Sequence, residues 1–173
     1  MPGSGKSCAA RELAAQLSAS GQRAYWVDLD EEVERRAGKS IARIFTEDGE
    51  AAFRALEKST LQCLIRDFST SFEETNDLSF RPSNASGEIS IVLALGGGTL
   101  MEPENLELVK KETYCIWLDT PLDVIAQRLW AQRNIGSRPL LASAKTKKEL
   151  EELLQSIYNT RKPAYQAAAK EVR

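Results

Sequence analysis

Two kinds of hydrophobic pattern alternate along the chain. Short apolar runs with little polar alternation are typical of strands buried on both faces of a parallel sheet. Such runs occupy residues 24–27, 89–95 and 114–118. Segments with apolar residues at helical spacing occur as well, at residues 6–18, 31–37 and about 50–68. Strands that alternate with helices predict an α/β fold built on a parallel sheet.

Capping residues predict two further helices in the second half of the chain. Thr120 can cap a helix whose first residue is Pro121, because proline fits the first helical turn. Thr146 and Glu149 form a capping-box pattern for a helix that runs to about residue 160.

The length and composition are those of an ordinary globular domain. The chain has 173 residues, of which 42% are hydrophobic and 28% charged, so we expect a single domain over 1–173 with its own core. Residues 69–88 lack periodicity and predict a surface insertion or loop. The formal net charge of −2 offers no basic surface for nucleic acid or an anionic membrane.

Two residue counts and the lack of a long apolar segment narrow the possible chemistry and the expected compartment. The chain contains no histidine, which excludes acid–base catalysis or metal binding by imidazole. Its three cysteines are isolated in sequence, so we expect neither a disulfide framework nor a zinc site. No apolar segment is long enough to span a bilayer and the start does not resemble a signal peptide, so we expect a cytoplasmic protein.

The segment at residues 1–7, MPGSGKS, matches all but the first residue of the phosphate-binding pattern GxxxxGK[ST], and we call it the phosphate loop. Gly3 and Gly5 allow the backbone to curl so that successive N–H groups face a phosphate. Lys6 then reaches the β- and γ-phosphates, and the Ser7 hydroxyl coordinates Mg²⁺. The alternative is a Gly/Ser-rich terminus without function, but the helix that follows Lys6 favours the phosphate-binding interpretation.

Two acidic residues, Asp28 and Asp30, follow the first apolar run. Strand periodicity predicts that both carboxylates point to the same side, at the end of the strand where open α/β sheets bind ligands. One can lie near Mg²⁺ through water, and the other can hold or deprotonate an acceptor hydroxyl. The alternative is a solvated acidic turn that leads into a helix.

Two features in the middle of the chain bear on ligand binding in different ways. Arg54 and Glu57 lie three residues apart on one helical face, a spacing that by itself favours an exposed ion pair. Gly96, Gly97 and Gly98 follow the apolar run at 89–95. Three residues without side chains at the end of a buried strand permit close approach of the backbone to a ligand, and a plain turn rarely needs three.

Two arginines late in the chain allow either a functional or a structural interpretation. Arg138 lies in a polar stretch at about 132–148, which predicts a mobile lid whose arginine neutralises charge on transferring phosphate; an ordinary loop arginine is the alternative. Arg161 precedes Pro163 near the expected end of a helix. It is either a partner of the helix dipole, which the sequence alone favours, or a carboxylate-binding arginine.

Taken together and in order, these motifs resemble the shikimate kinase family over nearly the whole chain. The matching segments are GSGKS at 3–7, DLD at 28–30, GKSIARIF at 38–45, GEAAFRALE at 49–57, LALGGGT at 93–99, RPLL at 138–141 and RKPAY at 161–165. The resemblance implies a three-layer α/β/α fold with a central parallel sheet in the strand order 2-3-1-4-5. It also implies a monomer that transfers the γ-phosphate of ATP to the 3-hydroxyl of shikimate, with Mg²⁺, in aromatic amino acid biosynthesis.

The resemblance assigns a role to each matching residue. Residues that contact ATP would be Gly3, Ser4, Gly5, Lys6, Ser7, Cys8, Arg133 and Arg138. Residues that contact shikimate would be Asp30, Arg54, Gly96, Gly97, Gly98 and Arg161. Ser7 and Asp28 would organise the metal, while catalysis would depend on Lys6, Asp30 and Arg138.

The chain differs from the family pattern at 69–88 and at both ends. Family members carry a central strand before the phosphate loop and a strand and helix after residue 165. We therefore expect that the sequence is incomplete, with the first and last strands missing. Two alternatives are a related kinase that acts on a metabolite such as gluconate, and a catalytically silent family member that binds ligand without turnover.

Overall fold

The computed structural model describes residues 1–69, 89–132 and 140–173. Its helices are α1 (Lys6–Ala19), α2 (Leu29–Ala37), α3 (Ile41–Glu47), α4 (Gly49–Ser69), α5 (Pro103–Glu112), α6 (Leu122–Ala131) and α7 (Lys147–Ala168). Its strands are β1 (Arg23–Asp28), β2 (Ile89–Ala94), β3 (Ile116–Trp117) and β4 (Glu171–Val172), and a short 3₁₀ helix, η2 (Thr99–Met101), follows the three glycines. The predicted insertion at 69–88 and the residues Arg133 and Arg138 lie outside the described residues, apart from the helical residue 69.

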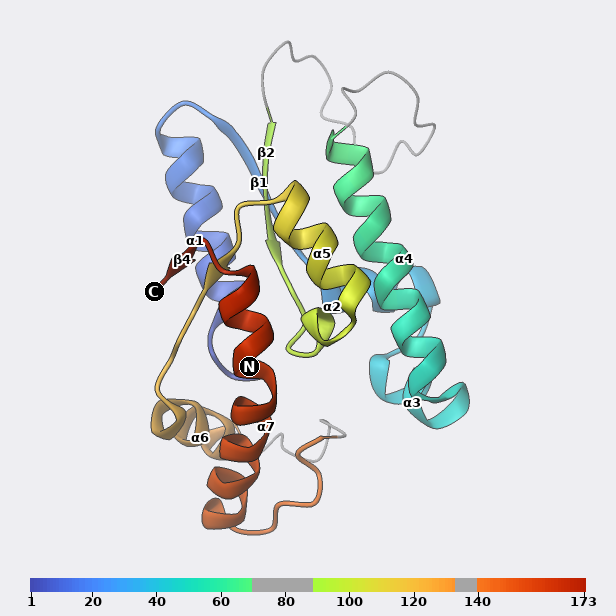
Figure 1. The fold of residues 1–173 in the computed structure, drawn as a ribbon, viewed down its shortest axis with the longest axis vertical. Helices are drawn as coiled ribbons and strands as arrows, with labels where there is room; N and C mark the ends of the chain where they lie inside the picture. Colours follow the sequence, from blue (N-terminus) through green and yellow to red (C-terminus); the bar gives the residue numbers. More distant parts are fainter. Residues whose placement is uncertain (70–88, 133–139) are drawn as a thin grey trace.

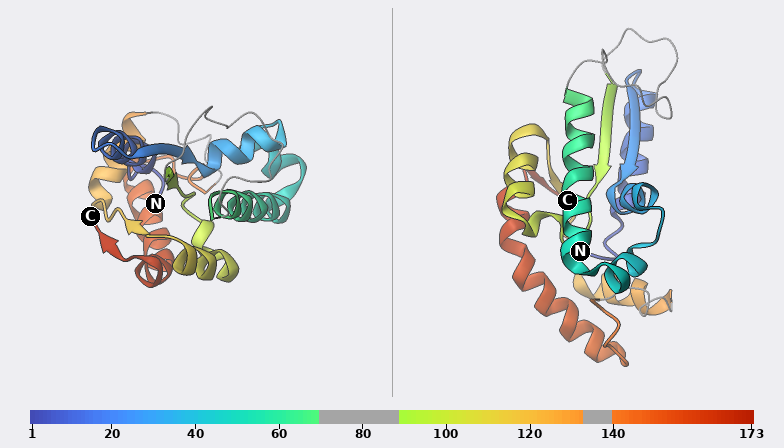
Figure 2. Two further views of the ribbon diagram at one scale, coloured as in Figure 1. Left: turned by 90° about the horizontal axis from the view of Figure 1, so that it is seen from above. Right: turned by 90° about the vertical axis from the view of Figure 1, so that its right-hand side faces the viewer.

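The helices form layers on both sides of the strands. Helix α1 packs on β1 and β2, while α5 and α7 pack against each other on the opposite side (Figures 1 and 2). The right-hand view of Figure 2 shows β1 and β2 standing between these two layers. The predicted three-layer α/β/α class is therefore confirmed.

The strands pair in two separate two-stranded sheets. β1 pairs with β2 in parallel, with Asp28 opposite Ala94, and β3 pairs with β4 in parallel. A cavity of about 550 Å³ lies between the two sheets and is lined mainly by apolar side chains, including those of Leu93 and Trp117. In the expected order 2-3-1-4-5, and within the described residues, β1 and β2 take the places of strands 2 and 3, and β3 and β4 take the places of strands 4 and 5. The prediction that the last strand is missing is wrong for its first residues, because Glu171 and Val172 form β4.

Most helix starts lie close to where local sequence signals place them. α1 begins at Lys6, as expected, and α7 begins after Thr146, whose hydroxyl accepts a hydrogen bond from the Glu149 amide at 3.1 Å. α2 begins two residues earlier than predicted, because Asp28 caps it by accepting from the Asp30 amide at 3.0 Å. An aspartate at this position satisfies one of the free N–H groups of the first turn.

Helix α6 begins in a different way from the prediction. Pro121 occupies the capping position rather than the first helical position, and no side chain caps the helix. The Thr120 hydroxyl, expected to be the cap, instead donates to the Ser4 carbonyl at 3.0 Å. A tertiary contact to the phosphate loop thus takes the place of the predicted local bond.

The end of α7 is the largest error among the predicted helices. The helix continues through Pro163 to Ala168, although the predicted end was about residue 160. Proline removes one backbone donor and strains the helix, but buried residues on both sides, Arg161 and Tyr165, fix α7 against the rest of the fold. Arg161 therefore lies inside a helix and not at its end, so the interpretation as a partner of the helix dipole is wrong.

A single core joins the helical layers. Fully buried apolar side chains come from α2, α3, α4, α6, α7 and the segment before α7, and the largest of them are Leu29, Ile44, Leu61, Ile125, Leu141, Leu150 and Leu154. Leu141 belongs to the predicted lid, so the part of the lid next to α7 is anchored in the core. None of the helices in the described parts of the chain is both long and apolar enough to cross a bilayer.

Candidate active site

The phosphate loop has the backbone conformation that its sequence predicts. Gly3 and Gly5 have φ angles of 76° and 87°, in the left-handed region that L-residues with side chains rarely adopt. A Cβ at Gly3 would also lie 2.9 Å from Leu129 Cγ. Gly5 occupies the capping position of α1, so the free amides of the first helical turn lie beside the loop.

The side chains of the loop contact its own backbone and the neighbouring helix. The Lys6 ammonium donates to the Met1 carbonyl at 2.8 Å, and the buried Ser4 hydroxyl donates to the same oxygen at 2.9 Å. Together with the bond from Thr120 to Ser4, these contacts hold the loop in its curved shape before any ligand binds. Cys8, predicted to contact ATP, lies exposed in the first turn of α1.

One cation near the loop was not predicted. A Cβ at Gly5 would lie 3.5 Å from Nη1 of Arg128, an exposed residue of α6. Arg128 comes close to the loop because Thr120 bonds Ser4 and so brings the start of α6 to the loop. The sequence does not show this long-range contact, so it could not have identified Arg128. Arg133, to which the resemblance assigned the nucleotide, lies outside the described residues.

The acidic residues Asp28 and Asp30 do not share one face of a strand. Asp28 ends β1 and accepts a hydrogen bond from the Ser7 hydroxyl, whereas Asp30 belongs to the first turn of α2. The two carboxylates therefore contact different groups, and the prediction that they point to the same side of a strand is wrong. Ser7 and Asp28 provide two adjacent oxygen ligands of the kind that Mg²⁺ accepts alongside water and phosphate oxygens. The described residues contain no larger group of acidic or cysteine side chains that could hold a metal.

Charged side chains from three helices meet at the three glycines after β2. A Cβ at Gly96 would lie 2.7 Å from Asp30 Oδ1, and one at Gly97 would lie 2.9 Å from Arg161 Nη1. At Gly98 the corresponding distance, to Arg54 Nη2, is 2.9 Å. Side chains at these positions would displace the charged groups, so the glycines are needed for close approach. We call these residues, with Glu57 and Thr99, the glycine cluster.

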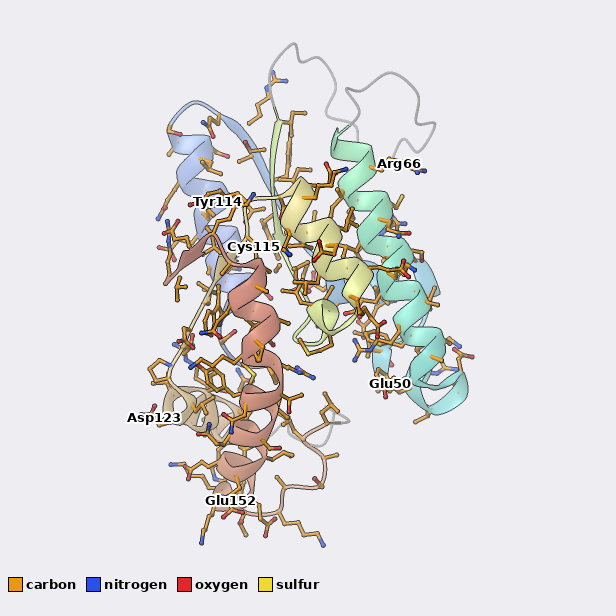
Figure 3. All side chains as sticks on the ribbon, in the orientation of Figure 1. Glu50, Arg66, Tyr114, Cys115, Asp123 and Glu152 are labelled. Carbon is orange, nitrogen blue, oxygen red and sulfur yellow. The ribbon has the colours of Figure 1, made fainter. Side chains whose placement is uncertain are left out.

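Glu57 links Arg54 to the turn that follows the glycines. Arg54 Nη1 donates to Glu57 Oε2 at 2.7 Å, and the Thr99 hydroxyl donates to Glu57 Oε1 at 2.6 Å. The Glu57 side chain is only 1% exposed, so the prediction of an exposed ion pair is wrong. Although burial opposes its charge, the hydrogen bond and charge of Glu57 raise the pKa of Arg54. Glu50 at the start of α4, labelled in Figure 3, accepts a second bond from Arg54 at 3.3 Å.

Two further buried polar residues hold the glycine turn: Asn105 was not predicted, and Tyr165 was noted only as part of the RKPAY segment, without a role. Asn105 on α5 donates to the Thr99 carbonyl at 3.1 Å, and Tyr165 on α7 donates to the Gly97 carbonyl at 2.6 Å. Both side chains are buried, and Thr99 is completely buried. The turn is therefore fixed from the α4, α5 and α7 sides.

The phosphate loop and the glycine cluster form one site. Pro2 of the loop lies against Gly97, where an added Cβ would be 3.5 Å from the proline Cδ. The β1–β2 register places the carboxyl ends of both strands at the same edge, where the chain turns into α2 and η2 (Figure 1). Ligands of open parallel sheets bind at this edge. The geometry can hold a phosphate beside a carboxylate-bearing ligand, with an acid, Asp30, near both.

Comparisons with known proteins agree with this geometry. A sequence model of the shikimate kinase family matches residues 2–71 and 81–173. The shikimate kinase of Rhodopirellula baltica is 34% identical over 168 residues, which cover 96% of this chain and 74% of that protein. The bifunctional shikimate kinase/3-dehydroquinate synthase of Thermotoga maritima is 35% identical over 165 residues, 95% of this chain, but the chain spans only 26% of that longer protein.

Solved structures of similar proteins share the fold. Shikimate kinase from Acinetobacter baumannii in complex with shikimate has a TM-score of 0.74 at 27% identity, covering 99% of this chain and 78% of that one. Shikimate kinase from Bacteroides thetaiotaomicron has a TM-score of 0.73 at 26% identity, covering 98% of this chain and 80% of the other.

Proposed function

The chain belongs to the shikimate kinase family, and from that premise we propose that it transfers the γ-phosphate of ATP to the 3-hydroxyl of shikimate, giving shikimate 3-phosphate and ADP. One observation supports this acceptor above all. Asp30, Arg54 and Arg161 converge on the three glycines directly beside the phosphate loop. That arrangement offers two cations for a carboxylate and one acid for a hydroxyl, next to a site for the transferred phosphate.

On the acceptor side, the two arginines bind the carboxylate of shikimate. A guanidinium group matches a carboxylate with two parallel N–H donors, so a pair of arginines fixes the orientation of the ring as well as its charge. The glycine backbone lies beside the ring, where a side chain would exclude it. Asp30 accepts a hydrogen bond from the hydroxyl that attacks, and it orients or deprotonates that group.

On the phosphate side, the loop amides and Lys6 bind the β- and γ-phosphates. Lys6 exchanges its bond to the Met1 carbonyl for phosphate oxygens, and Arg128 adds a second cation at the edge of the loop. Ser7 and Asp28 hold Mg²⁺, which neutralises charge on the phosphates when it is bound. Binding of both substrates in line, away from water, supplies most of the rate enhancement that phosphoryl transfer needs.

The lid over the site remains part of the proposal. Arg138 would neutralise charge on the transferring phosphate when the segment at about 132–148 closes, and Arg133 would contact the nucleotide. The buried Leu141 supports a lid that is anchored at its end near α7. We also propose a cytoplasmic monomer that requires neither nucleic acid nor membrane, which size-exclusion chromatography with light scattering can check for the oligomeric state.

A coupled ADP-release assay tests the proposed function. The purified chain is supplied with ATP and Mg²⁺, and with shikimate, gluconate or no acceptor. We expect ADP release that depends on shikimate and stops when the metal is chelated. Release with gluconate alone would redirect the assignment to another metabolite kinase. Shikimate binding by calorimetry without any release would identify a silent family member.

A further inference from the structure

Tyr165 is the buried side chain that contacts the glycine turn from the α7 side. It is 7% exposed, and its hydroxyl donates to the Gly97 carbonyl at 2.6 Å. The Met1 amine donates to the same hydroxyl at 3.3 Å. Removing the hydroxyl would take this donor from the partly buried Gly97 carbonyl, so the bond to Gly97 constrains both partners.

The tyrosine ring is itself held in place. It packs against Trp117 with ring centroids 6.0 Å apart, and it lies one helical turn after Arg161 on the same face of α7. Burial raises the pKa of the Tyr165 phenol against the opposing charge of Arg161, so the hydroxyl keeps its proton and stays a donor. A fixed ring with a permanent donor is suited to setting the position of a neighbouring backbone group.

Gly97 is enclosed by two side chains of the same helix. The Tyr165 hydroxyl holds its carbonyl, and Arg161 Nη1 approaches so closely that a Cβ would lie 2.9 Å away. Any shift of the Gly97 backbone therefore changes its distance to the Arg161 guanidinium. Since both groups belong to α7, the bond from Tyr165 fixes that distance.

We propose that Tyr165 is a positioning residue for the acceptor substrate: by holding the Gly97 carbonyl, it fixes the glycine backbone relative to the Arg161 guanidinium, and so sets how these two groups together face the shikimate ring and carboxylate. This inference rests on the proposed function, because it concerns the same site. Tyr165 acts through Gly97 and Arg161 and does not contact the transferred phosphate. Its loss should therefore weaken shikimate binding without weakening ATP binding.

The test compares Tyr165→Phe with a matched variant of the same helix, Tyr158→Phe. Tyr158 also packs against Trp117, at 6.4 Å between centroids, but its hydroxyl binds Asp119 at 2.9 Å, away from the glycines. We expect Tyr165→Phe to raise the KM for shikimate about fivefold, the effect of losing one buried hydrogen bond, with the KM for ATP unchanged. Tyr158→Phe should leave both values as in the wild type.

A second pair of variants separates positioning from folding. Tyr165→4-aminophenylalanine keeps a donor at the same place and should restore the wild-type KM for shikimate. Tyr165→4-methylphenylalanine fills the space of the hydroxyl without donating and should behave like Tyr165→Phe. The amino and methyl variants also test the inference by themselves if Tyr165→Phe does not fold. Equal shikimate KM values for the amino and methyl variants, or equal losses for shikimate and ATP, would overturn the inference.

The outcome also distinguishes this inference from the proposed function. If the wild-type chain neither binds shikimate by calorimetry nor releases ADP with it, the proposed function fails and the inference fails with it. If the wild type turns over shikimate and Tyr165→Phe has the same shikimate KM, only the inference fails.

Discussion

The phosphate loop and the glycine cluster lie side by side, yet their functional groups are held by different kinds of contact. In the loop, consecutive residues set the backbone, the Lys6 ammonium bonds the Met1 carbonyl of the same segment, and Ser7 is exposed. In the glycine cluster, side chains from three helices meet, and their polar atoms are largely buried: Glu57 is 1% exposed and Thr99 is fully buried. The first is a local structure and the second a tertiary one.

This difference determines how each region should respond to mutation. The loop presents backbone amides and the Lys6 ammonium to a ligand, and Lys6 and Ser7 lie outside the buried network of the cluster. The cluster is a buried network in which each group satisfies another, and removal of one partner leaves a desolvated polar group behind. Mutations in the cluster should therefore affect stability and acceptor binding together, whereas a mutation of Lys6 should mainly affect turnover.

The largest expected effect comes from Lys6→Ala. This variant removes the cation that we propose acts on the transferring phosphate, so kcat should fall by about a hundredfold or more. The melting temperature and the affinity for shikimate should stay close to those of the wild type, because Lys6 is not part of the buried network. Steady-state kinetics measures kcat, calorimetry with shikimate measures the affinity, and thermal unfolding measures the melting temperature.

Lys110→Ala is the matched control for that experiment. Lys110 pairs with Glu107 on the surface of α5 and contacts neither region of the site, so its loss should leave kcat unchanged. A Lys6→Ala variant that lost shikimate affinity as strongly as turnover would contradict the separation of the two regions.

The next effect should come from Arg54→Lys. Lysine keeps the positive charge for Glu57 but loses the two parallel donors, so the KM for shikimate should rise about ten- to a hundredfold while the KM for ATP stays the same. Arg43→Lys, in a surface pair with Glu47 on α3, should leave both values unchanged. An equal rise of both KM values would contradict the proposal that Arg54 binds shikimate rather than ATP.

A smaller, mainly structural effect is expected from Thr99→Val. Valine has the shape of threonine but cannot donate to Glu57, which leaves one buried carboxylate oxygen without this bond, so the free energy of unfolding should fall by about 1–3 kcal/mol. The KM for shikimate should rise only a few-fold. Urea unfolding of Thr99→Val and of Thr113→Val, whose hydroxyl bonds the Val109 carbonyl away from the site, gives the comparison. Equal stability losses would show that the cluster is no more sensitive than an ordinary helix end.

The smallest effect should come from Glu32→Gln, outside both regions. Hydrogen bonds from Arg35 and Arg36, with their charges, lower the pKa of Glu32 from its usual 4.5, against the effect of burial. A carboxyl whose folded pKa is lowered stabilises the protein above its unfolded pKa, and this contribution is lost as the pH falls through the lowered value. Glu32→Gln should thus lower the urea midpoint near neutral pH, and this difference should shrink as the pH falls below 4.5. A difference that persisted at low pH would show that the ion pairs are not its cause.

The sequence predicted well what depends on neighbouring residues. The start of α1 at Lys6, the capping of α7 by Thr146 and the curve of the phosphate loop follow from local patterns, and the structure contains all three. Local reasoning failed where a distant partner competed for a residue. Thr120 bonds the phosphate loop instead of capping α6, and α7 continues through Pro163 because Arg161 and Tyr165 are fixed in the interior.

By itself, the sequence determined the fold class, the phosphate loop and the family, because hydrophobic periodicity, turn residues and ordered motifs are properties of residues near one another in the chain. Only the tertiary structure decided what Asp30, Glu57 and Tyr165 contact. Their roles depend on which groups become buried together at the three glycines, and burial is set by the packing of helices far apart in sequence. The spacing of Arg54 and Glu57 predicts an exposed pair, but Gly96 and Thr99 pack against the glutamate and bury it.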